Sequence, residues 1–129
     1  MKNLLSRAAL PFIVLTMLAA PAFAQSLTGP QKNAVRSAKQ YLDMQGFSRA
    51  GLINQLSSDA GDGYKVADAT VAVDSLNADW NKQAERSAKQ YLDMMGFSCK
   101  GLIEQLSSSA GDGYTKDQAT HGARAAGAC

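Results

Sequence analysis

The sequence predicts an all-α protein made of two tandem three-helix helix-turn-helix repeats that follow a cleaved signal peptide. Three observations predict this: an internal repeat, apolar residues at helical spacing, and an export-type N-terminus. The chain has 129 residues, 46% of them hydrophobic and 19% charged, with 3 Pro and 2 Cys. This composition excludes intrinsic disorder, collagen and a small scaffold dense in disulfides.

The first two dozen residues have the three-part form of an export signal. Lys2 and Arg7 make a positive start, residues 8–20 an apolar stretch, and residues 22–24 a small-residue cleavage site. We therefore expect residues 1–24 to be a cleaved signal peptide. The apolar stretch is shorter than the roughly 20 residues that a spanning helix needs. No second apolar stretch follows, and no Cys stands at the cleavage site to take an acyl chain, so we expect neither a transmembrane segment nor a lipid anchor.

Cleavage changes the charge of the chain. It removes two basic residues of 13, and the remaining 11 Lys and Arg equal the 11 Asp and Glu in number. The isoelectric point of 8.6 therefore belongs to the precursor. The mature chain lacks the basic field typical of nucleic-acid-binding proteins. We expect an exported protein, periplasmic or secreted, that binds no nucleic acid.

An internal repeat organises the rest of the chain. Residues 34–64 and 84–114, aligned at an offset of 50, differ at 6 of 31 positions. A match of this length is not chance and marks a duplicated structural unit. We therefore assign residues 25–33 to an N-terminal linker, 34–79 to the first repeat and 80–129 to the second.

Each repeat begins with two predicted helices and a short turn between them. The apolar positions at helical spacing in the first repeat are Ala34, Ala38, Tyr41 and Leu42, then Leu52, Ile53 and Leu56. Gly46 is expected to end the first helix because glycine tolerates positive φ. Ser48 is expected to cap the second helix. The turn carries Phe47, and Phe97 in the second repeat, which we expect to fill the space between the helices.

A glycine-rich loop follows the second helix of each repeat. Residues 59–63 and 109–113 are expected to be loops because of their glycine content, and Tyr64 and Tyr114 close them. A calcium site is the alternative, but these loops lack the acidic series and the closing Glu of a helical calcium loop. We expect no metal and no cofactor.

A third helix completes each repeat. In the first repeat it is expected over residues 66–77. The third helix of the second repeat has a stronger N-terminal signal, because Thr115 is a good N-cap residue. This helix is expected to end poorly, since Gly122 and Gly127 inside a helix would each cost about 1 kcal/mol.

Trp80 stands at the junction of the two repeats. We expect it to pack as a wedge between the units, given the area that a Trp side chain buries. The alternative is an exposed anchor for a partner. Trp80, Tyr64 and Tyr114 are therefore the candidate interaction residues.

Both cysteines lie in the second repeat. An exported pair is more often oxidised than free, so we expect a Cys99–Cys129 disulfide that ties down the terminal helix. The alternative is intermolecular pairing through the terminal thiol. One His and two Cys supply too few ligands for a metal site. His121 has no equivalent in the first repeat, and we expect no catalytic residue and no enzyme.

A longer motif runs through both repeats. Its residues in the first repeat are Ala38-Lys39-Gln40-Tyr41, Met44, Gly46-Phe47-Ser48, Gly51-Leu52-Ile53, Gln55-Leu56-Ser57-Ser58, Gly61, Ala72-Val73-Asp74 and Ala78-Asp79-Trp80-Asn81. Most of it recurs over residues 88–111. In this motif the chain resembles the Ltp-like host cell surface-exposed lipoprotein family, whose members carry tandem helix-turn-helix repeats.

The resemblance implies a function in superinfection exclusion. Family members are known from temperate phages, where the exported protein of a resident prophage keeps incoming phage DNA out of the cell. The family's proposed partner is the tape-measure protein of the infecting phage. Two similar faces on one chain would gain avidity for a long or repetitive partner. The alternatives are a bacterial envelope protein with another role and, less favoured, a nucleic-acid-binding helix-turn-helix protein.

Overall fold

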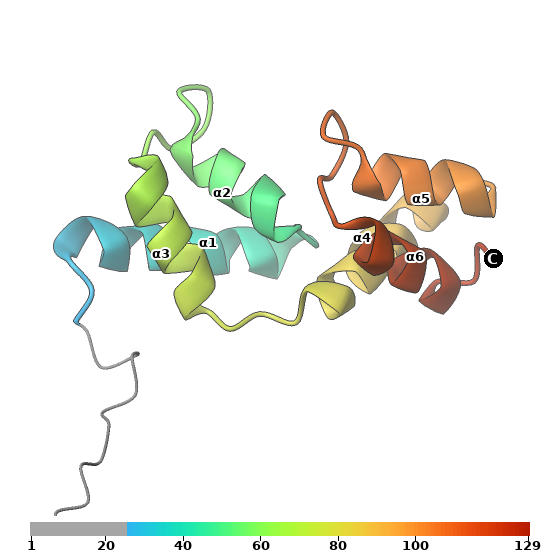
Figure 1. Ribbon diagram of the computed structural model, residues 1–129, viewed down its shortest axis with the longest axis horizontal. Helices are drawn as coiled ribbons and strands as arrows, with labels where there is room; N and C mark the ends of the chain where they lie inside the picture. Colours follow the sequence, from blue (N-terminus) through green and yellow to red (C-terminus); the bar gives the residue numbers. More distant parts are fainter. Residues whose placement is uncertain (1–25) are drawn as a thin grey trace, which may run out of the picture.

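The protein was analysed as a computed structural model that describes residues 26–129, so the predicted signal peptide lies outside the described residues. The described part is all-α, as predicted. Its helices are α1 (Gly29–Met44), α2 (Arg49–Ser57), α3 (Val66–Ser75), α4 (Trp80–Met94), α5 (Cys99–Ser107) and α6 (Lys116–Ala125). Helices α1 to α3 form the first repeat and α4 to α6 the second (Figure 1).

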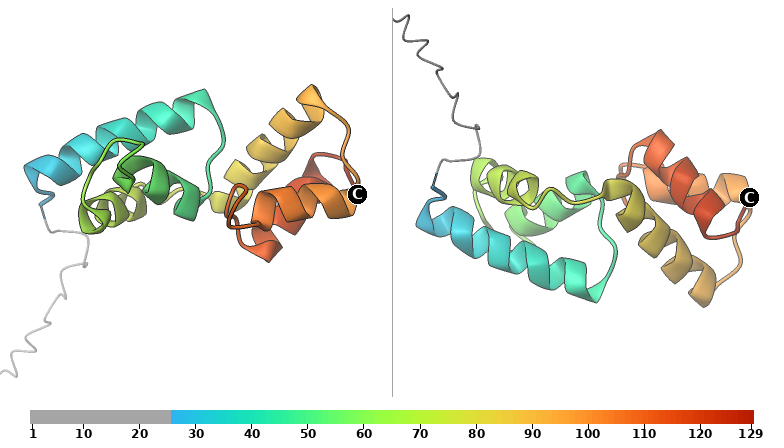
Figure 2. Two further views of the ribbon diagram at one scale, coloured as in Figure 1. Left: turned by 90° about the horizontal axis from the view of Figure 1, so that it is seen from above. Right: turned by 90° about the horizontal axis from the view of Figure 1, so that it is seen from below.

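The two repeats lie side by side along the long axis of the molecule (Figures 1 and 2). Within each repeat the third helix packs against the other two: α3 against α1 and α2, and α6 against α4 and α5. A short segment after α3 leads directly into α4. The start of α1 and the C-terminus therefore lie at opposite ends of the described molecule.

Each repeat has its own small hydrophobic core. The buried residues are Ala38, Leu52, Leu56, Ala69 and Val73 in the first repeat, and Ala84, Ala88, Leu102, Leu106, Tyr114, Ala119 and Ala123 in the second. Alanines on the first and third helices let their backbones approach closely, and leucines from the middle helix fill the remaining space. Phe47 meets Tyr41 edge to face at 5.7 Å between ring centroids, which confirms its predicted place between the helices.

Helix α1 begins at Gly29, five residues before the expected start at Ala34. The expected linker at residues 25–33 is therefore partly helical. Thr28 is the N-cap: its side chain accepts a hydrogen bond from the Gln31 backbone N–H at 3.3 Å, and the Gln31 side chain accepts one from the Thr28 N–H at 3.0 Å. This capping box, together with Pro30 in the first turn, is a sequence signal that the apolar spacing alone does not use.

The predicted caps at Ser48 and Thr115 are confirmed, and Ser98 caps the equivalent helix of the second repeat. Ser48 and Ser98 accept hydrogen bonds from the backbone N–H groups three residues on, at 2.8 and 2.9 Å. Thr115 forms a capping box with Gln118. These bonds satisfy N–H groups that have no partner inside the helix.

The ends of the third helices differ from the expectation. Helix α3 stops at Ser75 instead of residue 77, because Asn77 takes a left-handed conformation with φ 47°. Gly127 takes the same place after α6, with φ 90°. It therefore ends the helix instead of weakening its interior. Gly122 is inside α6, but a Cβ there would lie 2.6 Å from the Ala84 carbonyl oxygen, so glycine is what lets α6 approach α4.

Candidate functional site

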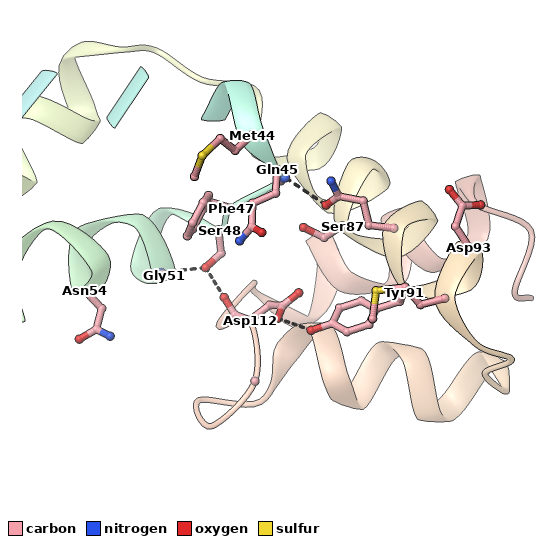
Figure 3. A pocket seen from close by; sticks show the side chains of 14 residues that line it. Met44, Gln45, Phe47, Ser48, Gly51, Asn54, Ser87, Tyr91, Asp93 and Asp112 are labelled. Carbon is pink, nitrogen blue, oxygen red and sulfur yellow. Dashed lines mark hydrogen bonds between the residues drawn. The ribbon is translucent and has the colours of Figure 1, made fainter. Parts of the chain in front are cut away.

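A groove of about 670 Å³ opens where the two repeats meet (Figure 3). One wall is the end of α1, the following turn and the start of α2. The other wall is the second half of α4 and the glycine-rich loop of the second repeat. The lining residues are Met44, Gln45, Gly46, Phe47, Ser48, Gly51, Asn54, Ser87, Gln90, Tyr91, Asp93, Met94, Gly111 and Asp112.

Two hydrogen bonds join the two walls of the groove. The Gly46 backbone N–H donates to the Gln90 side-chain carbonyl at 3.2 Å. The Ser48 hydroxyl donates to the Asp112 backbone carbonyl while it caps α2 (Figure 3). The same serine therefore both starts a helix and fixes the first repeat against the second.

Gly46 is required for a reason other than the one expected. It is not at positive φ, since the described residues with positive φ are Gly63, Asn77, Gly113 and Gly127. Instead, a Cβ on Gly46 would lie 2.5 Å from the Ser87 hydroxyl oxygen and 2.7 Å from the Gln83 carbonyl oxygen. Glycine is therefore needed because the backbone of the turn approaches α4 too closely for a side chain.

A polar chain supports the second wall. The Gln105 side-chain amide donates to the Tyr91 hydroxyl at 3.1 Å, and this hydroxyl donates to the Asp112 carboxylate at 2.7 Å. Burial raises the pKa of Asp112, and the Tyr91 hydrogen bond partly offsets this. Burial, followed by the Asp112 hydrogen bond, raises the pKa of Tyr91. The equivalent chain in the first repeat runs from Gln55 through Tyr41 to Asp62. The loop aspartates of both repeats thus accept tyrosine hydroxyls.

Two exposed methionines flank the groove. Met44 ends α1 and is 68% exposed, and Met94 ends α4 and is 72% exposed. When a partner covers large apolar side chains that are this exposed, their removal from water favours binding. Methionine is flexible and polarisable, so it adapts to partners of different shape. The groove therefore combines an adaptable apolar rim with the carboxylate of Asp93.

A protein-family model described as host cell surface-exposed lipoprotein matches residues 30–76 and 79–123. These two segments coincide with the two helical repeats and together span more than half of the chain. The chain belongs to this family. The resemblance that the repeated motif indicated is thus confirmed.

One solved structure of the family is similar along almost its whole length. It is Ltp, a superinfection exclusion protein from the Streptococcus thermophilus temperate phage TP-J34. The two chains are 32% identical with a TM-score of 0.68, and the match covers 77% of this chain and 97% of the phage protein. A comparison with curated proteins gave no match. Among the described residues of this family member, no helix has the length and apolar character to cross a membrane.

The expected disulfide is present in this member of the lipoprotein family. Cys99 at the start of α5 is bonded to Cys129, with 4.7 Å between their Cα atoms. In the first repeat the position of Cys99 is held by Arg49, which makes a two-point ion pair with Asp74 on α3. The ion pair thus fastens the start of α2 to α3. The disulfide fastens the start of α5 to the segment that follows α6.

The three candidate interaction residues lie in different places. Trp80 is half-buried and packs against the core of the first repeat although it begins α4, which is the wedge role expected for it. Tyr64 is half-buried, with its hydroxyl 3.1 Å from the Ser37 hydroxyl. Tyr114 is 3% exposed, and its hydroxyl lies 2.7 Å from that of Ser87. Burial raises the pKa of Tyr114 and gives it a packing role instead of an exposed contact.

His121 lies on α6 beside a carboxylate. Its Nε2 atom is 3.1 Å from Glu85, which also pairs with Lys82 at 3.0 Å. These two neighbours, Lys82 first, lower the pKa of Glu85. The described residues contain no group of three His, Cys, Asp or Glu side chains placed to hold a metal ion. Met44, although part of the repeated motif, and Met94 were not among the candidate interaction residues, because their exposure depends on how each helix ends.

Proposed function

We propose that this protein acts in superinfection exclusion by binding a protein of the infecting phage, the tape-measure protein, and so keeps phage DNA from entering the cell. The supporting observation is the 32% identity to a phage superinfection exclusion protein over 97% of that protein's length. Neither the family description nor the name of the phage protein refers to a catalytic activity. We propose binding alone as the mode of action.

The groove between the repeats is the proposed binding site. Its volume of about 670 Å³ accommodates several side chains of one helix or extended segment. Met44 and Met94 lie on its two walls, so a partner segment seated between them would cover both. Apolar side chains anchor the segment, and the polar groups that line the groove fix its direction.

The proposed action takes place outside the cytoplasm. The family description refers to exposure on the host cell surface. The N-terminal segment with its small-residue cleavage site supports export into the periplasm or the medium. Mass spectrometry of the protein from separated cell fractions tests this, because an exported chain begins at Gln25, whereas Met1 at the N-terminus of a cytosolic chain contradicts export.

A phage challenge tests the proposed function. The gene is expressed in a sensitive host, which is infected with related phages while adsorption and DNA entering the cell are scored separately. We expect normal adsorption with blocked DNA uptake. Unchanged plaque counts with every related phage would contradict the proposal.

The variant M44S/M94S tests the groove. We expect it to lose protection and to bind a purified tape-measure fragment at least about tenfold more weakly, because each buried methionine contributes on the order of 1.5 to 3 kcal/mol. V66S is the matched control, since Val66 is 63% exposed at the start of α3 and does not line the groove. Equal protection by both variants would place the binding surface elsewhere.

A further inference from the structure

Each repeat carries both halves of the junction that joins the two repeats. We call Gly46, Ser48 and Gly51 the turn edge of the first repeat, and Ser87, Gln90 and Asp112 the receiving edge of the second. The identical residues Gly96, Ser98 and Gly101 form a turn edge on the second repeat. Ser37, Gln40 and Asp62 form a receiving edge on the first. Within one chain, only one turn edge and one receiving edge meet.

The turn edge of the second repeat is open. A Cβ on Gly96 would meet nothing within 4 Å, whereas one on Gly46 would collide with α4. Ser98 is exposed although Ser48 is buried. Among residues 26–129, therefore, no contact requires a glycine at position 96.

The receiving edge of the first repeat is open as well. Asp62 is exposed and Ser37 is half-buried, whereas their equivalents Asp112 and Ser87 are half-buried and buried. A Cβ on Gly63 would meet nothing within 4 Å, but one on its equivalent Gly113 would contact Ser48 and Ala50. The same local structure is thus covered in one repeat and uncovered in the other.

The two open edges complement each other and lie on different repeats of an elongated molecule (Figure 2). We propose that a second copy of this chain docks the receiving edge of its first repeat on the turn edge of the second repeat, reproducing the junction between chains. In this contact the Gly96 N–H donates to Gln40 of the second copy, and the Ser98 hydroxyl donates to the Asp62 carbonyl. The contact is head-to-tail, so it leaves open edges at both ends and allows further copies to add.

The proposed contact between chains carries charges that the internal junction lacks. Ala50, which adjoins the loop of the second repeat, is replaced by Lys100 on the open turn edge. The loop of the first repeat carries Asp59 where the second has Ser109. Two of the differences between the repeats therefore add a cation to the open turn edge, where Lys100 also lies 4.0 Å from Glu104 of its own helix, and a carboxylate to the loop of the open receiving edge. Complementary charge of this kind selects the register of an interface and is weakened by salt.

Association between chains is weaker than the internal contact. The internal junction has the two cross-repeat hydrogen bonds described above and the packing of Trp80 on the first repeat, and between chains Pro30 stands in the place of Trp80. The short segment before α4 also holds the two halves of the internal junction at an effective concentration in the millimolar range. Without this tether we expect a dissociation constant of about 0.1 to 1 mM.

Sedimentation velocity of the oxidised chain from Gln25 onward, from about 10 μM to 1 mM, tests the proposal. We expect the average mass to rise with concentration beyond that of a dimer. G96A should weaken association at least about tenfold, because its Cβ would collide with Ser37 of the second copy. V71A is the control, since Val71 on α3 is 41% exposed and belongs to neither edge. A chain that stays monomeric throughout, or association that G96A leaves unchanged, would overturn the proposal.

A charge exchange provides an independent measurement. K100E should weaken association, and the double variant K100E/D59K should restore it, because the attractive pair is re-formed with its signs exchanged. Monomer folding is followed by circular dichroism; Lys100 is an exposed residue, so all variants should keep the helical spectrum. Loss in K100E without recovery in the double variant would contradict the assigned orientation of the two chains.

Discussion

At the scale of single residues, identical amino acids in the two repeats have different surroundings. Gly46 is needed because its backbone approaches α4, whereas Gly96 is in open space. Tyr114 is buried while Tyr64 is half-buried, although each hydroxyl is hydrogen-bonded to an equivalent serine. In each pair, one copy is therefore covered more than the other. A residue's role here follows from what a distant segment places beside it.

We predict that G46A destabilises the protein by about 1 to 3 kcal/mol, because the added methyl group forces the turn away from Ser87 and Gln83. G96A should change the free energy of unfolding by less than about 0.5 kcal/mol at low concentration. Thermal unfolding of the two variants at about 10 μM, far below the expected dissociation constant, makes the comparison. Equal destabilisation would mean that the turn does not contact α4 in solution.

The Arg49–Asp74 pair predicts a dependence of stability on pH. The Arg49 hydrogen bonds lower the pKa of Asp74, so the pair stabilises the folded state above the ordinary carboxyl pKa and this contribution is lost as pH falls through the lowered pKa. Both side chains are about half exposed, at 47% and 51%, so the contribution should stay below about 1 kcal/mol. Urea unfolding of wild type and D74N from pH 7 to pH 2 should show a difference that disappears in acid. D43N, at an exposed carboxyl outside this pair, is the control.

At the scale of helices, the start of the middle helix is held in place by a different kind of bond in each repeat. The start of α2 is fastened to α3 by the Arg49–Asp74 ion pair, and the start of α5 to the C-terminal segment by the Cys99–Cys129 disulfide. Middle helices of nine residues are too short to be stable alone. The covalent link fits α6, whose polar and small residues bury less apolar surface than those of α3.

Reduction of the disulfide should therefore destabilise the second repeat. Opening a loop of about 31 residues costs roughly 3.5 kcal/mol in the chain-entropy estimate. We expect hydrogen exchange in α5 and α6 to accelerate under reducing conditions, while α2 and α3 keep their protection. The C99S/C129S variant should behave like the reduced protein and show no further response to reductant. Equal acceleration in both repeats would show that they unfold as one unit.

At the scale of the whole molecule, two small cores are coupled through a narrow junction. Trp80 crosses it, since it belongs to α4 but packs on the core of the first repeat. The groove is the open part of the same junction. A partner seated in the groove would therefore contact both repeats and fix their relative position.

We predict that W80A destabilises the first repeat more than the second. Removing a half-buried Trp should cost about 2 to 3 kcal/mol, somewhat less than for a fully buried aromatic residue. Hydrogen exchange followed by mass spectrometry should show faster exchange in α1 to α3, with α5 and α6 little changed. Y91F, which removes a hydroxyl in the second repeat, should give the opposite pattern. Preferential loss in the second repeat after W80A would contradict the packing described here.

Much of the fold follows from local sequence signals. Ser48 and Thr115 cap their helices as predicted, and Ser98 does the same in the second repeat, because capping depends on a side chain and the backbone three residues away. The same kind of signal at Thr28 marks the true start of α1. The prediction that Gly122 and Gly127 weaken the last helix was wrong, because it used helix propensity alone. Gly122 allows α6 to approach α4 closely, and Gly127 ends the helix.

The sequence by itself determined the class of the protein: a duplicated, all-helical family member with one pair of cysteines able to oxidise. Periodicity, capping and duplication are properties of neighbouring or aligned residues, so a linear chain displays them. Only the tertiary structure decided which copy of each repeated residue is covered, where the groove opens and which methionines flank it. Burial is set by the segments that fold over a residue, and two identical stretches of sequence therefore acquire different surfaces.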